Sequence, residues 1–328
     1  MKRLDGARFA RLIVIAVGVW VVAAVVCTLG GSTGSFGQVS GSIARLRWTT
    51  HVLPASLIGA SLAAAGVAYQ AVLRNPLADP YLLGASSGAM LATYLWRMPL
   101  VAALPWVGGW SPHAFSLTGA LLAVGAVMCV ARRGGRIDPV TAVLAGVIVN
   151  ALCGSAFMLL NAIYRDLPGS GGMMAFLAGD IQTSAATRDV WISGILCGGS
   201  LLALVPLAAS LNVIRLSEDE AASLGIRVHR VRWIALGLAS LMTAASVAIS
   251  GPIGFVGLVC PHIGRWFVGN DNRRLLIVSM ALGASLLALA DLLERVLLDR
   301  LGTLVPVGVI TSLIGAPFFL LLLLRGRR

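Results

Sequence analysis

Residues 74–89, RNPLADPYLLGASSGA, follow one apolar run of the chain and lead into the next. A polar, proline-broken segment in this position is either a loop or irregular backbone that lines a cavity inside a membrane. We therefore expect a turn, held by side-chain to backbone hydrogen bonds from Asn75 and Asp79. Gly84 and Gly88 would let the helices that follow approach their neighbours closely.

The composition decides the class of protein. The chain has 328 residues, of which 58% are hydrophobic and 12% charged, and its mean hydropathy is +0.91. Soluble domains carry about 25% charged residues, so we predict an all-α, polytopic membrane protein with one transmembrane domain over residues 1–328. The net charge of +12 is spread in short clusters between apolar runs. This pattern argues against a nucleic-acid partner.

About ten apolar runs are long enough to cross a bilayer, or nearly so. If the N-terminus is cytoplasmic and the runs alternate in direction, 18 of the 25 Lys and Arg residues fall inside and 7 outside. That bias is the positive-inside rule, and it predicts two cytoplasmic ends. The runs lie at residues 12–29, 52–73, 82–96, 113–131, 140–163, 190–210, 233–250, 253–268, 275–293 and 305–324.

A second glycine–proline break follows the seventh run, in the segment GPIGFVGLVCPHIGR at residues 251–265. The second and seventh runs would cross in opposite directions, so matching breaks after both indicate an inverted repeat whose broken helices line a transport path. A purely architectural role is the competing interpretation. The candidate path and gate-turn residues are Asn75, Pro76, Asp79, Gly84, Asn150, Gly251 and Pro252.

The segment at about residues 211–230 is predicted to be the longest cytoplasmic connection. Ser217 can cap a helix whose first turn is acidic, and Gly225 can end it. Such a helix is either a docking element for a cytoplasmic partner or a plain connector. The candidate contact residues are Glu218, Asp219, Glu220, Ala221, Ala222, Leu224 and Gly225.

Several kinds of chemistry are missing from the sequence. A phosphate-binding loop of the GxxxxGK[ST] type needs a lysine, and Lys2 is the only one. The four histidines have no metal-binding spacing, so we expect no metal, no cofactor and no enzymatic activity.

Asp291 and Arg295 are spaced to pair on one helix face. No chain of carboxylates crosses the membrane, which argues against a proton-driven carrier. Residues 30–47 are expected to form a connector.

Four blocks of the sequence resemble the FecCD-type permeases of ATP-binding-cassette (ABC) importers. They occur in the family's order and span most of the chain. They are GASLAAAGVAYQAVLRNPLADPYLLGASSGA at residues 59–89, EDEAASLGI at 218–226, GPIGFVGLVCPHIGR at 251–265 and VPVGVITSLIGAPFFLLLLLR at 305–325.

The resemblance implies a type II ABC importer fold and a bacterial inner-membrane location. It implies a homodimer with the path on its axis, lined by residues 138–163 and 305–324, within membrane lipid. Two cytoplasmic ATPase subunits would dock on residues 218–225, and a periplasmic binding protein would deliver the substrate. A bulky iron chelate, either a ferric siderophore or heme, is the expected cargo. Cobalamin is an alternative cargo, and a stand-alone secondary carrier or channel is an alternative of another class.

Two motifs depart from the family pattern. The family's Arg-x-Pro-Arg before the second helix is replaced here by Trp48-Thr49-Thr50-His51. The family's Pro-Glu-Leu-Pro before the last helix has lost its glutamate. We expect nearby side chains to meet carboxylates of the binding protein instead. The candidates are Arg45, Arg47, His51 and Arg300.

Overall fold

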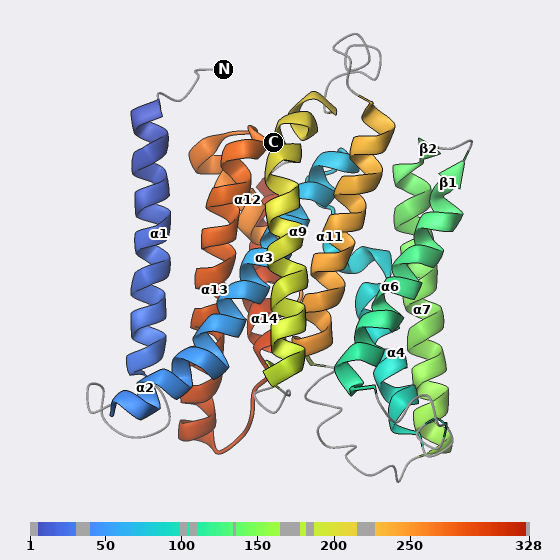
Figure 1. Ribbon diagram of the computed structural model, residues 1–328, viewed down its shortest axis with the longest axis horizontal. Helices are drawn as coiled ribbons and strands as arrows, with labels where there is room; N and C mark the ends of the chain where they lie inside the picture. Colours follow the sequence, from blue (N-terminus) through green and yellow to red (C-terminus); the bar gives the residue numbers. More distant parts are fainter. Residues whose placement is uncertain are drawn as a thin grey trace.

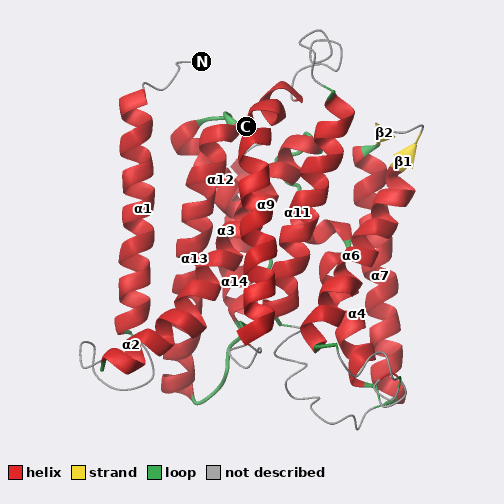
Figure 2. Ribbon diagram, in the orientation of Figure 1, coloured by secondary structure: helices red, strands yellow, loops and turns green. Residues whose placement is uncertain are grey.

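The computed structural model describes residues 6–30, 40–98, 101, 104, 110–133, 136–164, 178–181, 187–214 and 227–325. Within these residues each predicted apolar run is a helix, which confirms the all-α prediction (Figures 1 and 2). The helices are α1 (Gly6–Leu29), α3 (Leu53–Val72), α4 (Ala85–Arg97), α6 (Pro112–Ala131), α7 (Pro139–Ile163), α9 (Thr187–Ile214), α11 (Val228–Ser250), α12 (Val256–Val268), α13 (Asn272–Leu301) and α14 (Val307–Arg325).

Five short elements lie between these helices in the described part of the chain. The α-helix α2 (Gly41–Arg47) runs into the π-helix η1 (Trp48–Val52), and the 3-10 helix η2 (Pro80–Leu83) precedes α4. Two-residue strands β1 (Arg132–Arg133) and β2 (Arg136–Ile137) pair antiparallel between α6 and α7.

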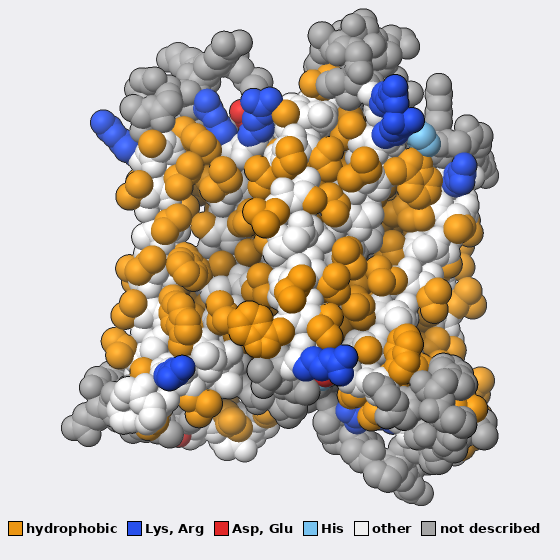
Figure 3. Space-filling view, in the orientation of Figure 1, with side chains coloured by type: hydrophobic (Ala, Val, Ile, Leu, Met, Phe, Trp, Pro, Cys, Tyr) orange, Lys and Arg blue, Asp and Glu red, His pale blue; other side chains and the backbone are white. Residues whose placement is uncertain are grey.

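Seven of the described helices are long and apolar enough to cross a membrane. The helices α4 and α12 are shorter, with 13 residues each, as the short third and eighth runs predict. Hydrophobic side chains cover the middle of the molecule, while Lys and Arg gather at its two rims (Figure 3). This distribution is that of a multi-pass membrane protein.

Both ends of the chain lie on one side of the molecule (Figure 1). We call this side the chain-end face and the opposite side, which carries α2, the α2 face. Two ends on one side require an even number of crossings, as about ten alternating helices predict.

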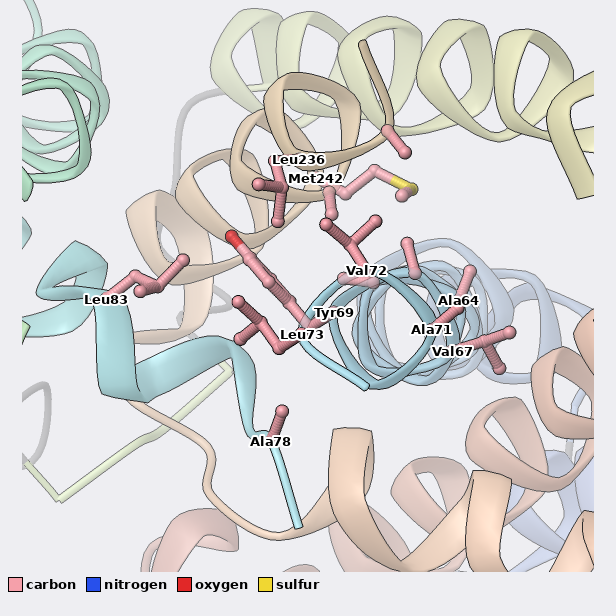
Figure 4. Close-up of a cluster of buried hydrophobic side chains, with 14 of the residues drawn as sticks. Ala64, Val67, Tyr69, Ala71, Val72, Leu73, Ala78, Leu83, Leu236 and Met242 are labelled. Carbon is pink, nitrogen blue, oxygen red and sulfur yellow. The ribbon is translucent and has the colours of Figure 1, made fainter. Parts of the chain in front are cut away.

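Helix α3 forms the centre of the bundle and packs against α9, α11, α12 and α13. Small residues allow this packing, because a Cβ at Gly59 would overlap the carbonyl of Gly283, and one at Gly66 that of Gly257. Tyr69 projects from α3 towards α11, where its hydroxyl lies 2.7 Å from that of Ser240 (Figure 4).

The helices α4, α6 and α7 form a second group, which meets the first through α11. Gly88 of α4 faces Gly119 of α6, and a side chain at Gly88 would overlap the Gly119 backbone. This contact confirms the predicted close approach at Gly88. Gly84 has φ 84°, and a Cβ there would lie 3.0 Å from Val149 of α7.

The expectation of a connector over residues 30–47 is wrong for its last seven residues, which form α2. Residues 42–47, SIARLR, contain no glycine or proline and favour a helix. The chain then continues through η1 directly into α3. Thr49 and Thr50 satisfy their hydroxyls on the backbone carbonyls of Arg45 and Leu46, four residues earlier.

Candidate functional site

The polar turn between α3 and α4, residues 73–84, is called here the first break. Asn75 Oδ1 accepts a hydrogen bond from the backbone N–H of Leu77 at 2.9 Å. Asp79 Oδ1 accepts one from Tyr81 N–H, also at 2.9 Å, and so caps η2. These contacts confirm the predicted hydrogen bonds of Asn75 and Asp79. Arg74 has a positive φ of 51°, which is rare for a residue with a side chain.

The turn between α11 and α12, residues 251–255, is called the second break. Gly251 ends α11 by donating its N–H to the carbonyl of Val247 at 2.8 Å. Gly251 and Phe255 have positive φ values of 62° and 69°. A bulky residue such as Phe255 adopts this conformation only where its surroundings hold it there.

The two breaks are hydrogen-bonded to each other. The N–H of Ile253 donates to the Tyr81 hydroxyl at 2.9 Å, and the Asp79 carboxylate accepts from the N–H of Phe255. Pro80 also packs on α12, since a Cβ at Gly257 would lie 2.7 Å from its Cδ. The first and second breaks therefore form one unit, which we call the joined breaks.

Helix α7 is fastened to this unit by Asn150. Its Nδ2 donates to the carbonyl of Tyr81 at 3.1 Å, and its Oδ1 accepts from the Ser87 hydroxyl at 2.6 Å. The structure therefore brings Asp79, Asn150 and the second break together around Tyr81. Asn75 and Pro76 are exposed at the other end of the first break.

Sequence reasoning missed three members of the site. Tyr81 stands inside the quoted stretch, and a buried tyrosine needs a partner for its hydroxyl, so this signal was readable. No sequence pattern around Gly179 or Gly308 indicates that these two residues belong to the site. The N–H of Gly308 donates to the Gly179 carbonyl at 2.7 Å, and a Cβ at Gly179 would overlap Pro252.

The predicted contact residues of the 211–230 segment lie outside the described residues. They are Glu218, Asp219, Glu220, Ala221, Ala222, Leu224 and Gly225. The end of α9, which precedes them, is described and is held at two places. The Ile214 carbonyl accepts from Arg74 Nε and Nη2 at 3.2 and 2.8 Å. Asn212 donates to Asp271 and accepts from Asn272 N–H, both at 2.7 Å. The start of this segment is thereby fixed to the first break and to α13.

The candidate docking residues of the α2 face fall into two pairs. Arg45 and Arg300 are exposed. Arg47 is 8% exposed and donates to the carbonyl of Thr28 at 3.1 Å. His51 Nδ1 lies 3.1 Å from the carboxylate of Asp291. Arg47 and His51 thus have partners within the chain, whereas Arg45 and Arg300 are presented outward.

A buried polar cluster lies beside His51. Arg295 pairs with Asp291 at 3.0 Å, which confirms the predicted i,i+4 pair, and it also donates to the carbonyl of Cys27 at 3.2 Å. Asp180 and Glu294 share a hydrogen bond. Burial raises the pKa of the Asp180 carboxyl, whereas the bond it accepts from Glu294 opposes this rise, so the shared proton stays on Glu294. The cluster fastens the short segment at 178–181 to α13.

Comparison with known proteins gives a consistent result. The model of the FecCD transport family matches residues 10–325. A hemin transport system permease protein of Yersinia pestis is 37% identical over 277 residues, which is 84% of this chain and 81% of the relative. A cobalamin import system permease protein of Halobacterium salinarum is 37% identical over 280 residues, covering 83% and 71% of the two chains.

One solved structure has the same fold over nearly the whole chain. It is an inward-facing conformation of a metal-chelate type ABC transporter, with a TM-score of 0.82 and 27% identity. The match covers 96% of this chain and 99% of that one.

Proposed function

The chain belongs to the FecCD transport family and is an ABC transporter permease subunit, and on this premise we propose that it imports a bulky iron chelate, a ferric siderophore or heme, by alternating access. The observation that carries the proposal is the pair of joined breaks inside a chain of this family. Discontinuous helices that meet inside the membrane are typical of transport paths. The chain-end face would lie in the cytoplasm of a bacterium and the α2 face in the periplasm, and the bias of Lys and Arg along the sequence supports this orientation.

The energy would come from two cytoplasmic ATPase subunits, since the chain has no phosphate-binding loop of its own. They would dock on residues 218–225. Arg74 supports this coupling route, because it ties the end of α9 to the first break. Movement of the docked segment would then pull on the joined breaks through a short and direct connection.

Co-purification tests the ATPase partner. We expect the chain, expressed together with the ATPase of its own transport system, to retain that ATPase in detergent. Changing Leu224 and Gly225 together should release it. The control is the exposed Arg273→Gln on the same face, which should keep the partner. If both variants keep the ATPase, docking at Leu224 and Gly225 is ruled out.

The path itself would lie between two copies of the chain, along α7 and α14. In its most apolar stretch, α7 is only 17% buried, and many large side chains of both helices are exposed in one copy. A second copy or lipid must cover such surfaces. Lipid would cover α1, which is also 17% buried in its most apolar stretch. Cysteine cross-linking along α7 in native membranes tests the homodimer, and monomers at every position would contradict it.

A periplasmic binding protein would dock on the α2 face. Among the four candidates, the proposal rests on Arg45 and Arg300, because Arg47 and His51 have partners inside the chain. We expect Arg45→Glu with Arg300→Glu to weaken binding-protein affinity at least tenfold, since each reversal turns attraction into repulsion. Arg273→Glu on the opposite face is the matched control. Unchanged affinity in the double variant would remove these two arginines from the docking surface.

Cobalamin is the second candidate cargo, because a relative at the same level of identity is a cobalamin import permease. ATP hydrolysis by the reconstituted complex, with its binding protein, distinguishes the cargoes. We expect a ferric siderophore or heme to stimulate hydrolysis and cobalamin to leave it unchanged. Stimulation by cobalamin alone would move the proposal to that cargo.

A further inference from the structure

A short segment, residues 178–181, lies against the second break and the start of α14, and we call it the latch segment. A Cβ at Gly179 would overlap the carbonyl oxygen of Pro252, so only glycine fits at this position. The side chain of Ile181 is 4% exposed and belongs to the same hydrophobic cluster as Val307. The latch segment therefore joins the second break to the first turn of α14.

One backbone hydrogen bond fastens the latch segment to α14. The N–H of Gly308 donates to the carbonyl of Gly179 at 2.7 Å. Gly308 is the second residue of α14, and the first N–H groups of a helix have no acceptor within that helix. The latch segment supplies the missing acceptor from outside. Exchange of the Gly308 amide hydrogen with water therefore reports whether the latch segment is in place.

The hydrogen bond between the carboxyl groups of Asp180 and Glu294 fastens the latch segment to α13. An ionised carboxylate has no hydrogen to donate, so this bond exists only while the pair holds a proton. Glu294 is buried, whereas Asp180 is half-buried, so the pair is not sealed from water. Loss of the proton would leave two negative charges side by side, where they repel each other.

The cations beside this pair of carboxyl groups are engaged with a third carboxylate. Arg295 pairs with Asp291 at 3.0 Å and also donates to two backbone carbonyls. His51 faces Asp291 as well, at 3.1 Å. The second break and the first turn of α14 contain no titratable side chain. The titratable and charged groups around the pair are Asp291, Arg295 and His51, with Arg47 and Cys27 beside Arg295.

We propose that residues 178–181 are a proton-operated latch, which the proton shared by Asp180 and Glu294 holds against α13 and which opens when that proton is lost. The pair binds its proton more tightly in the latched form, because only there do the two carboxyl groups meet. The latched form is therefore favoured at low pH and is lost as the pH rises. If α14 lines the path, as the proposed function has it, the latch would set the position of the α2-face end of the path.

Hydrogen exchange at Gly308 tests the latch, followed by mass spectrometry of the full-length chain in detergent from about pH 5 to about pH 9. Asp180→Asn and Glu294→Gln each replace one carboxyl group by an amide, which donates to the remaining carboxylate at every pH. Asp299→Asn is the control, because Asp299 is exposed on the same helix. His51→Gln removes the nearby imidazole, since histidine ordinarily changes charge near neutral pH. Thermal unfolding shows which variants are folded.

We expect the protection of the Gly308 amide in the wild type, corrected for the pH dependence of exchange itself, to fall about tenfold per pH unit over part of this range, the effect of one proton lost on opening. Asp299→Asn and His51→Gln should show the same fall, and the folded amide variants should show none. Constant protection in the wild type, a fall that persists in a folded amide variant, or a fall abolished by His51→Gln overturns the proposal. The measurement needs neither cargo nor ATPase, so its failure is distinct from failure of the proposed function.

Discussion

Helices α3 and α7 are both apolar spans, yet they have opposite environments. The span Gly41–Val72 contains α3. In its most apolar stretch the mean hydropathy is 1.7 and 83% of the residues are buried. In the most apolar stretch of α7 the mean hydropathy is 2.2 and only 17% of the residues are buried. The more apolar helix is therefore the less buried one.

The difference in burial between α3 and α7 follows from the lipid that surrounds the protein. Lipid is as apolar as leucine, so large aliphatic side chains gain little by leaving it, and close helix packing depends on small residues. Helix α3 is rich in Ala, Gly and Ser, whereas large Leu, Ile, Val and Met side chains of α7 are exposed. In this chain, high hydropathy marks a surface for lipid or a second copy, and small residues mark the core.

The largest expected effect tests this reading with a matched pair of glycines. Gly66→Val in α3 would force a side chain into the backbone of Gly257, whereas a Cβ at Gly154 in α7 meets nothing within 4 Å. We expect Gly66→Val to cost more than about 4 kcal/mol of unfolding free energy, and Gly154→Val less than about 1 kcal/mol. Thermal unfolding in detergent measures both. Equal losses would contradict the assignment of α3 to the core and α7 to the surface.

A smaller effect is expected where α3 leads into the joined breaks. Asp79→Ala leaves the N–H groups of Tyr81 and Phe255 without their acceptor. Bonds to a charged acceptor contribute about 1.5–3 kcal/mol, so we expect a loss of this size in unfolding free energy. Asp79→Asn keeps an acceptor and should recover part of it. Full stability in Asp79→Ala would show that the breaks are held by packing alone.

Asn150→Ala tests how α7 is attached to the rest of the molecule. The change removes the bonds to the Tyr81 carbonyl and the Ser87 hydroxyl. We expect a loss of about 1–2 kcal/mol, since both bonds are neutral. Cross-linking between α7 and the first break should fall with it. If it does not, packing against α4 and α6 holds α7 without this amide.

Tyr81→Phe should have the smallest effect on stability, about 1 kcal/mol, because it removes the bond from the N–H of Ile253 to the Tyr81 hydroxyl. Its effect on transport should be larger, since this bond links the two breaks directly. Uptake by the complete transporter, measured beside the unfolding midpoint, separates the two. Normal uptake with a lowered midpoint would give this bond a structural role only.

The sequence predicts the helices well and their contacts poorly. Each apolar run became a helix, and the turn bonds of Asn75 and Asp79 are local, so spacing alone predicted them. The bond from Ile253 to Tyr81 joins residues 172 positions apart and has no local pattern. The helix α2 was missed because a Gly/Ser-rich start hid the helix-forming residues after it. The inward contacts of Arg47 and His51 depend on α1 and α13, which sequence reasoning could not place.

The most direct test of the account is uptake into proteoliposomes. We predict that this chain, reconstituted with its ATPase subunits and binding protein, imports a ferric siderophore or heme only when ATP is present on the chain-end face, and that the chain alone imports nothing. ATP-independent uptake by the chain alone would contradict the account and identify a secondary carrier or channel.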